Sequence, residues 1–269
     1  MIALRFTQQQ LVKTLGNLAI IGLSLTLVII LQESRLKPSE QTIDAKKYQE
    51  LEQVEKLQLD VIKGFPSLGF DNLLADWLYL RFIQYFGDGD ARNHTGYLLS
   101  ADYFEIIVKH DPRFVNALLK LDAVTSIFAG EPEKSVKFLD QSLKVTPPKL
   151  EGPLIAPYYL WIYKAVNELL FLGDVEAAKQ SYTMAANWAE TYEDETSQRI
   201  AANKRNTVQF LATNPTSKIP QIGAWTSVLS GAADKKTQER AIAEIQALGG
   251  EIIITPEGTL RVRVPEWVD

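Results

Sequence analysis

Apolar residues are most concentrated in one uncharged run near the N-terminus. From 15 to 31 the chain is LGNLAIIGLSLTLVIIL, and extension back to residue 11 adds only Lys13 as a charge. At a rise of about 1.5 Å per residue, roughly 20 residues cross the hydrocarbon core of a bilayer. The pattern predicts a transmembrane anchor at 11–32, preceded by an N-terminal tail at 1–10.

Two other interpretations of this run remain open, a cleaved signal peptide and a buried helix of a soluble protein. The run is longer than the apolar region of an ordinary signal peptide, and 32–35 offers no small-residue cleavage site. Counting the basic residues on either side places the C-terminal side in the cytoplasm. A short basic tail such as 1–10, however, is typical of a signal-anchor. We therefore expect a single-pass membrane protein whose large domain lies on the non-cytoplasmic, periplasmic or lumenal, side.

A connecting arm at 33–65 follows, and within it 43–57 has the composition of a helix. Its apolar residues recur every three positions on one stripe, made of Tyr48, Leu51, Val54 and Leu57. We expect a short amphipathic helix that packs on the domain through this stripe. A dimerising coiled coil is the alternative, but the arm holds barely two heptads.

Helical periodicity continues through most of 66–215. Asp71 is placed to cap a helix that ends at Gly87, and a polar loop follows to residue 96. Further helices are expected near 97–110, 113–129, 132–145, 157–172 and 174–190. Gly130 and Gly173 fall in the tight turns between paired helices. Paired helices of about 15 residues joined by tight turns are typical of a helical-repeat solenoid.

Two of these segments resemble the tetratricopeptide repeat. In each segment, two small residues flank a large one at the family's spacing. The better copy is LGDVEAAKQSYTMAANWAE, with Ala178, Tyr182 and Ala185 at these positions. The weaker copy is AGEPEKSVKFLDQSLKVTPP, with Ser135, Leu139 and Ser142 at these positions and the closing Pro147. The first-helix tryptophan and glycine of the family are missing, and the two turns lie 43 residues apart rather than about 34. Another all-α bundle therefore remains the alternative to a mainly α, tetratricopeptide-like solenoid.

The C-terminal part, 216–269, differs from the repeats and is expected to hold C-terminal helices and a β-hairpin. Asp234 is placed to cap a helix that ends at Gly249, and EIIIT and TLRVRV around a Pro-Glu-Gly turn predict a β-hairpin. Leu260, Val262 and Val264 alternate with polar residues, so we expect one buried face. The hairpin is expected to pack on the preceding helix and to close the array, with strand addition at its free edge as the alternative.

Composition narrows the classes of function. The 269 residues include no cysteine, which excludes disulfides, thiolate metal sites and a cysteine nucleophile. The formal net charge of −5 argues against general nucleic-acid binding, which needs an excess of Lys and Arg.

The sequence contains few candidate catalytic or metal-binding residues. His110 is expected to interact with a helix end, and the loop containing Asp88 and His94 is expected to be solvated rather than to hold a cation. The acidic run 190–195 is expected to mark a loop and helix start. The common nucleotide-binding, zinc-protease and hydrolase motifs are missing from the sequence. We expect no catalytic site, cofactor, metal or small-molecule substrate.

Recognition of a protein partner remains. The resemblance implies a concave groove lined by the first helix of each pair, and the candidate groove residues are Lys120, Val124, Phe128, Tyr163, Asn167 and Phe171. Aromatic residues also crowd the helix after residue 71, and we interpret them mostly as core, with a protein or membrane contact as the alternative.

The sequence therefore predicts a membrane-anchored, protein-binding scaffold that helps to assemble, stabilise or localise a membrane protein complex. Its partner is expected to be another protein, a subunit of that complex, with membrane contact through 11–32. A stoichiometric accessory subunit and an enzyme of unrecognised type are the alternatives.

Overall fold

The computed structural model describes residues 44–150, 155–213, 215, 217–254 and 260–265, together with ten residues between 17 and 29. The chain forms two units, Met1–Asp44 and Ala45–Asp269.

The predicted membrane anchor at 11–32 falls largely outside the described residues. Among the helices that the structure describes, none combines the length and the apolarity that a bilayer crossing requires. The prediction of a single-pass membrane protein, with its large domain on the periplasmic or lumenal side, is therefore wrong for this structure.

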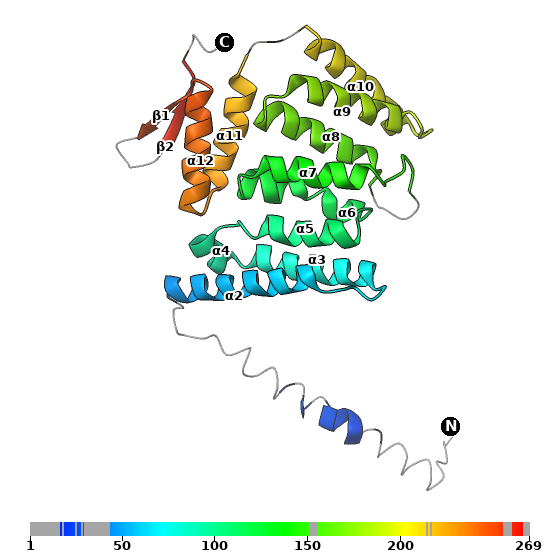
Figure 1. Ribbon diagram of the computed structural model, residues 1–269, viewed down its shortest axis with the longest axis vertical. Coiled ribbons are helices and arrows are strands. Elements are labelled where there is room, and N and C mark those ends of the chain that lie inside the picture. The colour runs from blue at the N-terminus through cyan, green and yellow to red at the C-terminus, as the bar shows by residue number, and fades with distance from the viewer. Residues whose placement is uncertain are drawn as a thin grey trace, which may run out of the picture. The chain divides into compact units, whose positions relative to one another are not determined.

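The second unit is mainly helical, as predicted. Its helices are α2 (Ala45–Gly64), α3 (Asp71–Gly87), α4 (Gly89–Thr95), α5 (Ser100–His110), α6 (Val115–Leu118), η1 (Asp122–Phe128), α7 (Pro132–Leu143), α8 (Tyr158–Val166), η2 (Asn167–Phe171), α9 (Val175–Ala189), α10 (Glu195–Leu211), α11 (Ile219–Gly231) and α12 (Lys235–Ala247). From α2 to α10 they lie in succession along the unit, and α11 and α12 lie beside this stack (Figure 1).

The predicted β-hairpin is confirmed. Strands β1 (Glu251–Ile254) and β2 (Leu260–Arg263) pair antiparallel, with Ile252 opposite Val262. Ile252, Val262 and Val264 pack against the apolar side chains of α11 and α12, so the alternation seen in the sequence does separate a packed face from an exposed one. As expected for an isolated hairpin, β1 rests on α12.

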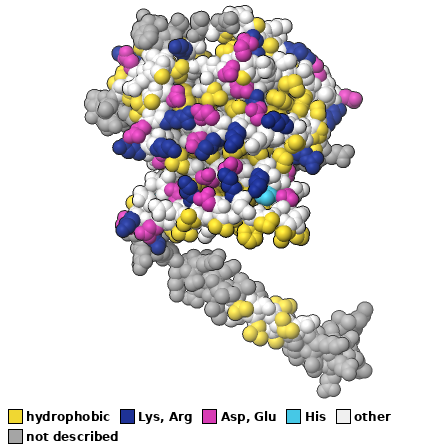
Figure 2. Space-filling model, viewed as in Figure 1, with side chains coloured by type: hydrophobic (Ala, Val, Ile, Leu, Met, Phe, Trp, Pro, Cys, Tyr) yellow, Lys and Arg dark blue, Asp and Glu magenta, His cyan; other side chains and the backbone are white. Residues whose placement is uncertain are grey.

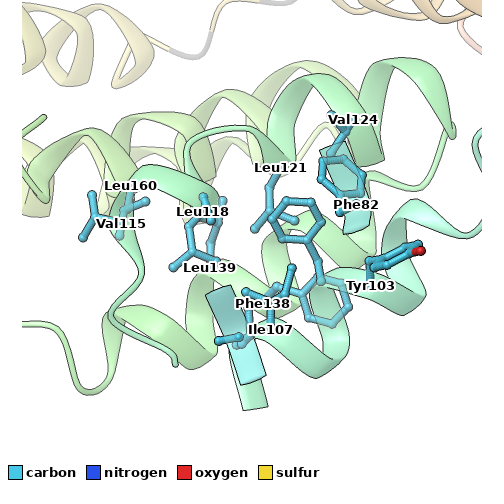
Figure 3. Packing of buried hydrophobic residues seen from close by; sticks show 14 of the residues in the cluster. Phe82, Tyr103, Ile107, Val115, Leu118, Leu121, Val124, Phe138, Leu139 and Leu160 are labelled. Carbon is cyan, nitrogen blue, oxygen red and sulfur yellow. The ribbon is translucent and has the colours of Figure 1, made fainter. Parts of the chain in front are cut away.

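The principal core lies between α3, α5, η1, α7 and α8, and Figure 3 labels residues from this cluster. Phe82 of α3 is 1% exposed and meets Tyr103 and Phe104 of α5 edge-on, with ring centroids 5.8 and 4.9 Å away. These contacts pack one side of α3 against α5, and the other side of α3 faces away from the core.

The prediction that glycines lie in the turns between paired helices is confirmed at two positions. Gly130 and Gly173 have φ of +63° and +67°, a region that glycine enters without the steric cost that a Cβ brings. The predicted cap at Asp234 is also confirmed, since its side chain accepts from the backbone N–H of Thr237 at 2.9 Å.

Three local predictions differ from the structure. Asp71 is the first residue of α3 and makes no N-cap, since Phe70 takes that place without a side-chain hydrogen bond. The expected loop at 88–96 contains α4, because Asp88 accepts from the N–H of Ala91 and starts a helical turn. Helices were expected within 216–269, but the bounds of α11 were not predicted, since Pro220 and Gly223 stand where a sequence pattern suggests a loop.

Candidate functional site

Exposed apolar side chains gather at one end of the stack. Of the 17 large exposed hydrophobic residues described in the second unit, eleven fall between 51 and 83. They lie on α2, on α3 and on the turn between them, and we call them the α2–α3 face: Leu51, Val54, Leu57, Val61, Phe65, Leu68, Phe70, Leu73, Trp77, Leu80 and Ile83. Figure 2 shows hydrophobic side chains in a row along the lower edge of this unit, where α2 lies.

Helical spacing explains why these side chains form one surface. Residues three or four apart lie on the same side of a helix, and Leu73, Trp77 and Leu80 follow that spacing along α3. Val54 and Val61, seven residues apart, do the same along α2. The two rows flank a shallow space between the helices.

That space contains two adjoining hollows. The larger, of about 530 Å³, is lined by Ile62, Phe65, Pro66, Ser67, Phe70, Leu73, Leu74 and Trp77. The smaller, of about 360 Å³, is lined by Val54, Leu57, Gln58, Val61, Ile62 and Arg81. Because Ile62 borders both, the hollows form one groove along the hairpin, and its lining is almost entirely apolar.

The side of α2 that faces the stack is held mostly by polar contacts. Glu52 accepts from Nη1 of the buried Arg92 at 3.1 Å, and Glu55 accepts from Nη2 of Arg81 at 2.7 Å. Tyr103 also donates to Glu55. Burial raises the pKa of Glu52, and the hydrogen bond from Arg92 opposes that rise. Helix α2 is thus attached through its acidic side, which leaves its apolar side exposed.

The apolar stripe of α2, which was expected to pack on the domain, therefore faces away from it. Leu51, Val54 and Leu57 are 49%, 50% and 64% exposed. Only Tyr48 of that stripe meets the domain, by stacking on His94 with ring centroids 5.0 Å apart. Leu59, which is 1% exposed, and Ile62 supply the apolar contact with the stack instead.

The opposite end of the stack is polar. Helix α10 exposes Gln198, Arg199, Asn203, Asn206 and Gln209, and the large hydrophobic residue exposed among its described positions is Phe210. A terminal helix of a stack needs such a polar outer face to remain soluble alone. The α2–α3 end has the apolar surface that an internal layer would bury.

The six candidate groove residues do not form an open surface. Val124 and Phe171 are 5% and 9% exposed and Asn167 is fully buried, whereas Lys120 is exposed and Phe128 and Tyr163 are half-buried. Phe171 packs edge-on against Trp225 of α11, with centroids 5.6 Å apart. Helix α11 lies on η1 and η2 and covers part of the predicted surface.

Asn167 has a structural role. Its Nδ2 donates to Asp122 Oδ1 at 2.9 Å and to the carbonyl of Tyr163, while Ser126 donates to its Oδ1. Burial raises the pKa of Asp122. Because the amide satisfies groups from η1 and α8 together, it fixes the packing of these helices.

A buried ion pair joins Lys164 of α8 to Glu168 of η2, and it was not identified from the sequence. Lys164 and Glu168 are 9% and 4% exposed, and Nζ lies 2.6 Å from Oε1. Ser181 of α9 donates to Glu168 at 2.6 Å, and Asp140 of α7 lies 3.3 Å from the same ammonium. The one signal in the sequence was a Lys–Glu pair four residues apart within an apolar helix.

His110 and Asp71 join α5 to the start of α3. His110 Nδ1 lies 2.7 Å from Asp71 Oδ1, and this hydrogen bond holds the pKa of the Asp71 carboxyl below its usual range. A lowered folded-state pKa means that the ionised carboxylate adds stability above the unfolded-state pKa, and that this stability is lost as pH falls through the folded-state pKa.

We expect Asp71→Asn to lower the thermal unfolding midpoint at neutral pH, because it removes the charge that His110 stabilises. The difference from the wild type should shrink in acid, as the wild-type carboxyl itself becomes protonated. Melting curves between about pH 6 and about pH 2 measure this, with Asp76→Asn, an exposed position on the same helix, as the control. A difference that stays constant over the range would show that the charge is not responsible.

The residues of the α2–α3 face were only partly anticipated. Trp77 belongs to the aromatic residues that crowd the helix after residue 71, whereas no sequence pattern indicated Phe65, Leu68 or Leu73. The available signal was that α3 has apolar residues around its whole circumference, which a helix buried on only one side does not need. Comparison with family models, with curated proteins and with solved structures finds no match to this chain.

Proposed function

We propose that this chain is a protein-binding scaffold, and that it joins the complex it helps to assemble through the α2–α3 face. The observation that carries the proposal is the gathering of eleven large exposed hydrophobic residues on this one face. Monomeric soluble proteins rarely expose contiguous apolar patches beyond a few hundred Å², and larger patches mark interaction surfaces.

The groove is suited to a helical partner. Its two walls are antiparallel helices, its floor is apolar, and Arg81, the one charged residue in its lining, is already paired with Glu55. An apolar helix face laid into such a groove meets no unpaired charge, so its desolvation cost is low.

A tetratricopeptide-like array is part of this proposal. The positions that carry the resemblance are occupied as packing requires: Ala178, Ala185, Ser135 and Ser142 are fully buried, and the large residues Leu139 and Tyr182 are buried beside them. Small residues at these places let neighbouring helices approach. These contacts support a repeat architecture, whose usual role is to hold other proteins.

The test is whether capture of a partner depends on the face. Leu73 and Leu80 are 65% and 63% exposed, so Leu73→Asp/Leu80→Asp leaves the core intact while it places two charges in the patch. Phe210→Asp on α10 is the matched control, since Phe210 is 61% exposed at the other end of the stack.

After chemical cross-linking in native extract, we expect the wild-type chain and the control to retain the same protein in a fixed ratio. The face variant should lose at least about 90% of it, because a charge in an interface centre costs more than tenfold in affinity. Equal retention by all three chains would contradict the proposal, as would the lack of any retained protein.

A further inference from the structure

We infer that the protein covering the α2–α3 face is a second copy of the same chain, related to the first by a two-fold axis. The inference rests on the proposed function, because it names the partner for the same face. Three observations support a second copy: the area of the face, its helical geometry and its distribution of charge.

The exposed area matches what a stable dimer needs. The eleven side chains are between 44% and 80% exposed. Together they leave on the order of 1,000 Å² accessible, whereas a standard specific interface needs about 800 Å² from each partner. Two such faces together bury on the order of 2,000 Å², which is the lower end of the range for obligate homodimers.

The geometry suits a second pair of helices, since α2 and α3 each pack on α5 and leave the groove open between them. Helix α2 has 20 residues and α3 has 17, so the antiparallel pair presents rows about 25 to 30 Å long. A two-fold axis through the face places the two hairpins against each other, with all four helices burying their apolar sides as in a four-helix bundle. In this arrangement the apolar α2–α3 end of each stack is covered by its copy. The other end, at α10, needs no cover because its outer face is polar.

Charge allows two identical faces to meet. Exposed charges of both signs occur on α2 and α3, namely Lys46, Lys47, Lys56, Lys63, Glu50, Asp60 and Asp76. A margin of mixed sign provides opposite charges for a copy of itself, whereas a margin of one sign would repel it. The same balance argues against a lipid surface, since adsorption to anionic headgroups needs a basic excess.

Sedimentation of the purified full-length chain tests the inference. We expect a species of twice 30.2 kDa at about 10 μM, and association weakened by at least about 100-fold in Leu73→Asp/Leu80→Asp. Phe210→Asp should behave as the wild type. Circular dichroism of each variant confirms that the helical fold is retained.

Cysteine cross-linking gives a second readout that does not depend on charge. The chain has no cysteine, so a single cysteine can be introduced at one site at a time. Near a two-fold axis a residue faces its own copy, so at least one of Val61→Cys, Leu73→Cys and Trp77→Cys should form a disulfide-linked dimer. Phe210→Cys should form no disulfide-linked dimer.

The outcomes separate this inference from the proposed function. A monomer that still retains another protein through the face overturns the second copy and leaves the scaffold proposal standing. A dimer unaffected by the face variant overturns the inference as well. A monomer that retains no protein, or whose face binds phosphatidylcholine vesicles instead, overturns both.

Discussion

Lys164→Met is expected to lower the free energy of unfolding by about 3–5 kcal/mol, because it leaves the carboxylate of Glu168 buried without its cation. The 2.6 Å contact joins two side chains that are both at least nine-tenths buried. Ser181 remains as a donor to Glu168, but one hydroxyl does not neutralise a charge. Urea unfolding followed by circular dichroism measures the loss.

The double variant Lys164→Met/Glu168→Leu provides the control. Removing both charges replaces the pair by apolar volume, which is often neutral or stabilising, so most of the loss should be recovered. If the single variant costs less than about 1 kcal/mol, or the double variant is no more stable than the single one, the pair is not energetically coupled.

Phe82→Ala is expected to cost about 3–5 kcal/mol, the usual range when a buried phenylalanine is truncated. Its ring meets Tyr79, Phe86, Tyr103 and Phe104, so the cavity would open between α3 and α5. Neighbouring rings are too rigid to close it fully. Chemical denaturation at a fixed protein concentration gives the difference.

Trp77→Ala, on the outer side of the same helix, is the matched comparison. Trp77 is 44% exposed, so in a chain kept monomeric by Leu73→Asp/Leu80→Asp its truncation should cost less than a third as much as that of Phe82. Equal losses at the two positions would mean that the outer side of α3 is packed as tightly as the inner side.

Much of the fold follows from local signals in the sequence. Gly130 and Gly173 predicted turns because few other residues adopt positive φ, and Asp234 predicted a cap because its carboxylate reaches the next free N–H groups. The alternation of Val262 and Val264 with arginines predicted a hairpin with one packed face. Each of these signals acts within a few residues, so it is visible in a single sequence.

Other parts of the fold depend on contacts between distant segments. Helix α4 forms where glycines and aspartates predict a loop, and it is held in place by Arg92, which reaches Glu52 on α2. The π-helical segment η2 lies where a regular helix was predicted, and the buried Asn167 at its start bonds across to Asp122. No local pattern encodes a partner 40 or more residues away.

The candidate site shows the same limit. Periodicity identified the apolar stripe of α2, but it carries no information on which side of a helix meets the domain. The acidic side of α2 faces the domain because its carboxylates accept hydrogen bonds there. Glu52 accepts from Arg92, and Glu55 accepts from Arg81 and Tyr103. The candidate groove residues show a related limit, since no local pattern indicates that α11 packs on Phe171.

The most direct test of the scaffold account is site-specific photo-cross-linking on the α2–α3 face. A photoreactive phenylalanine analogue placed at Trp77 should form a cross-link to protein in native extract, either to a second copy or to another chain. The same analogue at Phe210, which is exposed at the other end of the stack, should form little. Equal cross-linking at the two positions, or none at Trp77, would contradict the claim that this face binds protein.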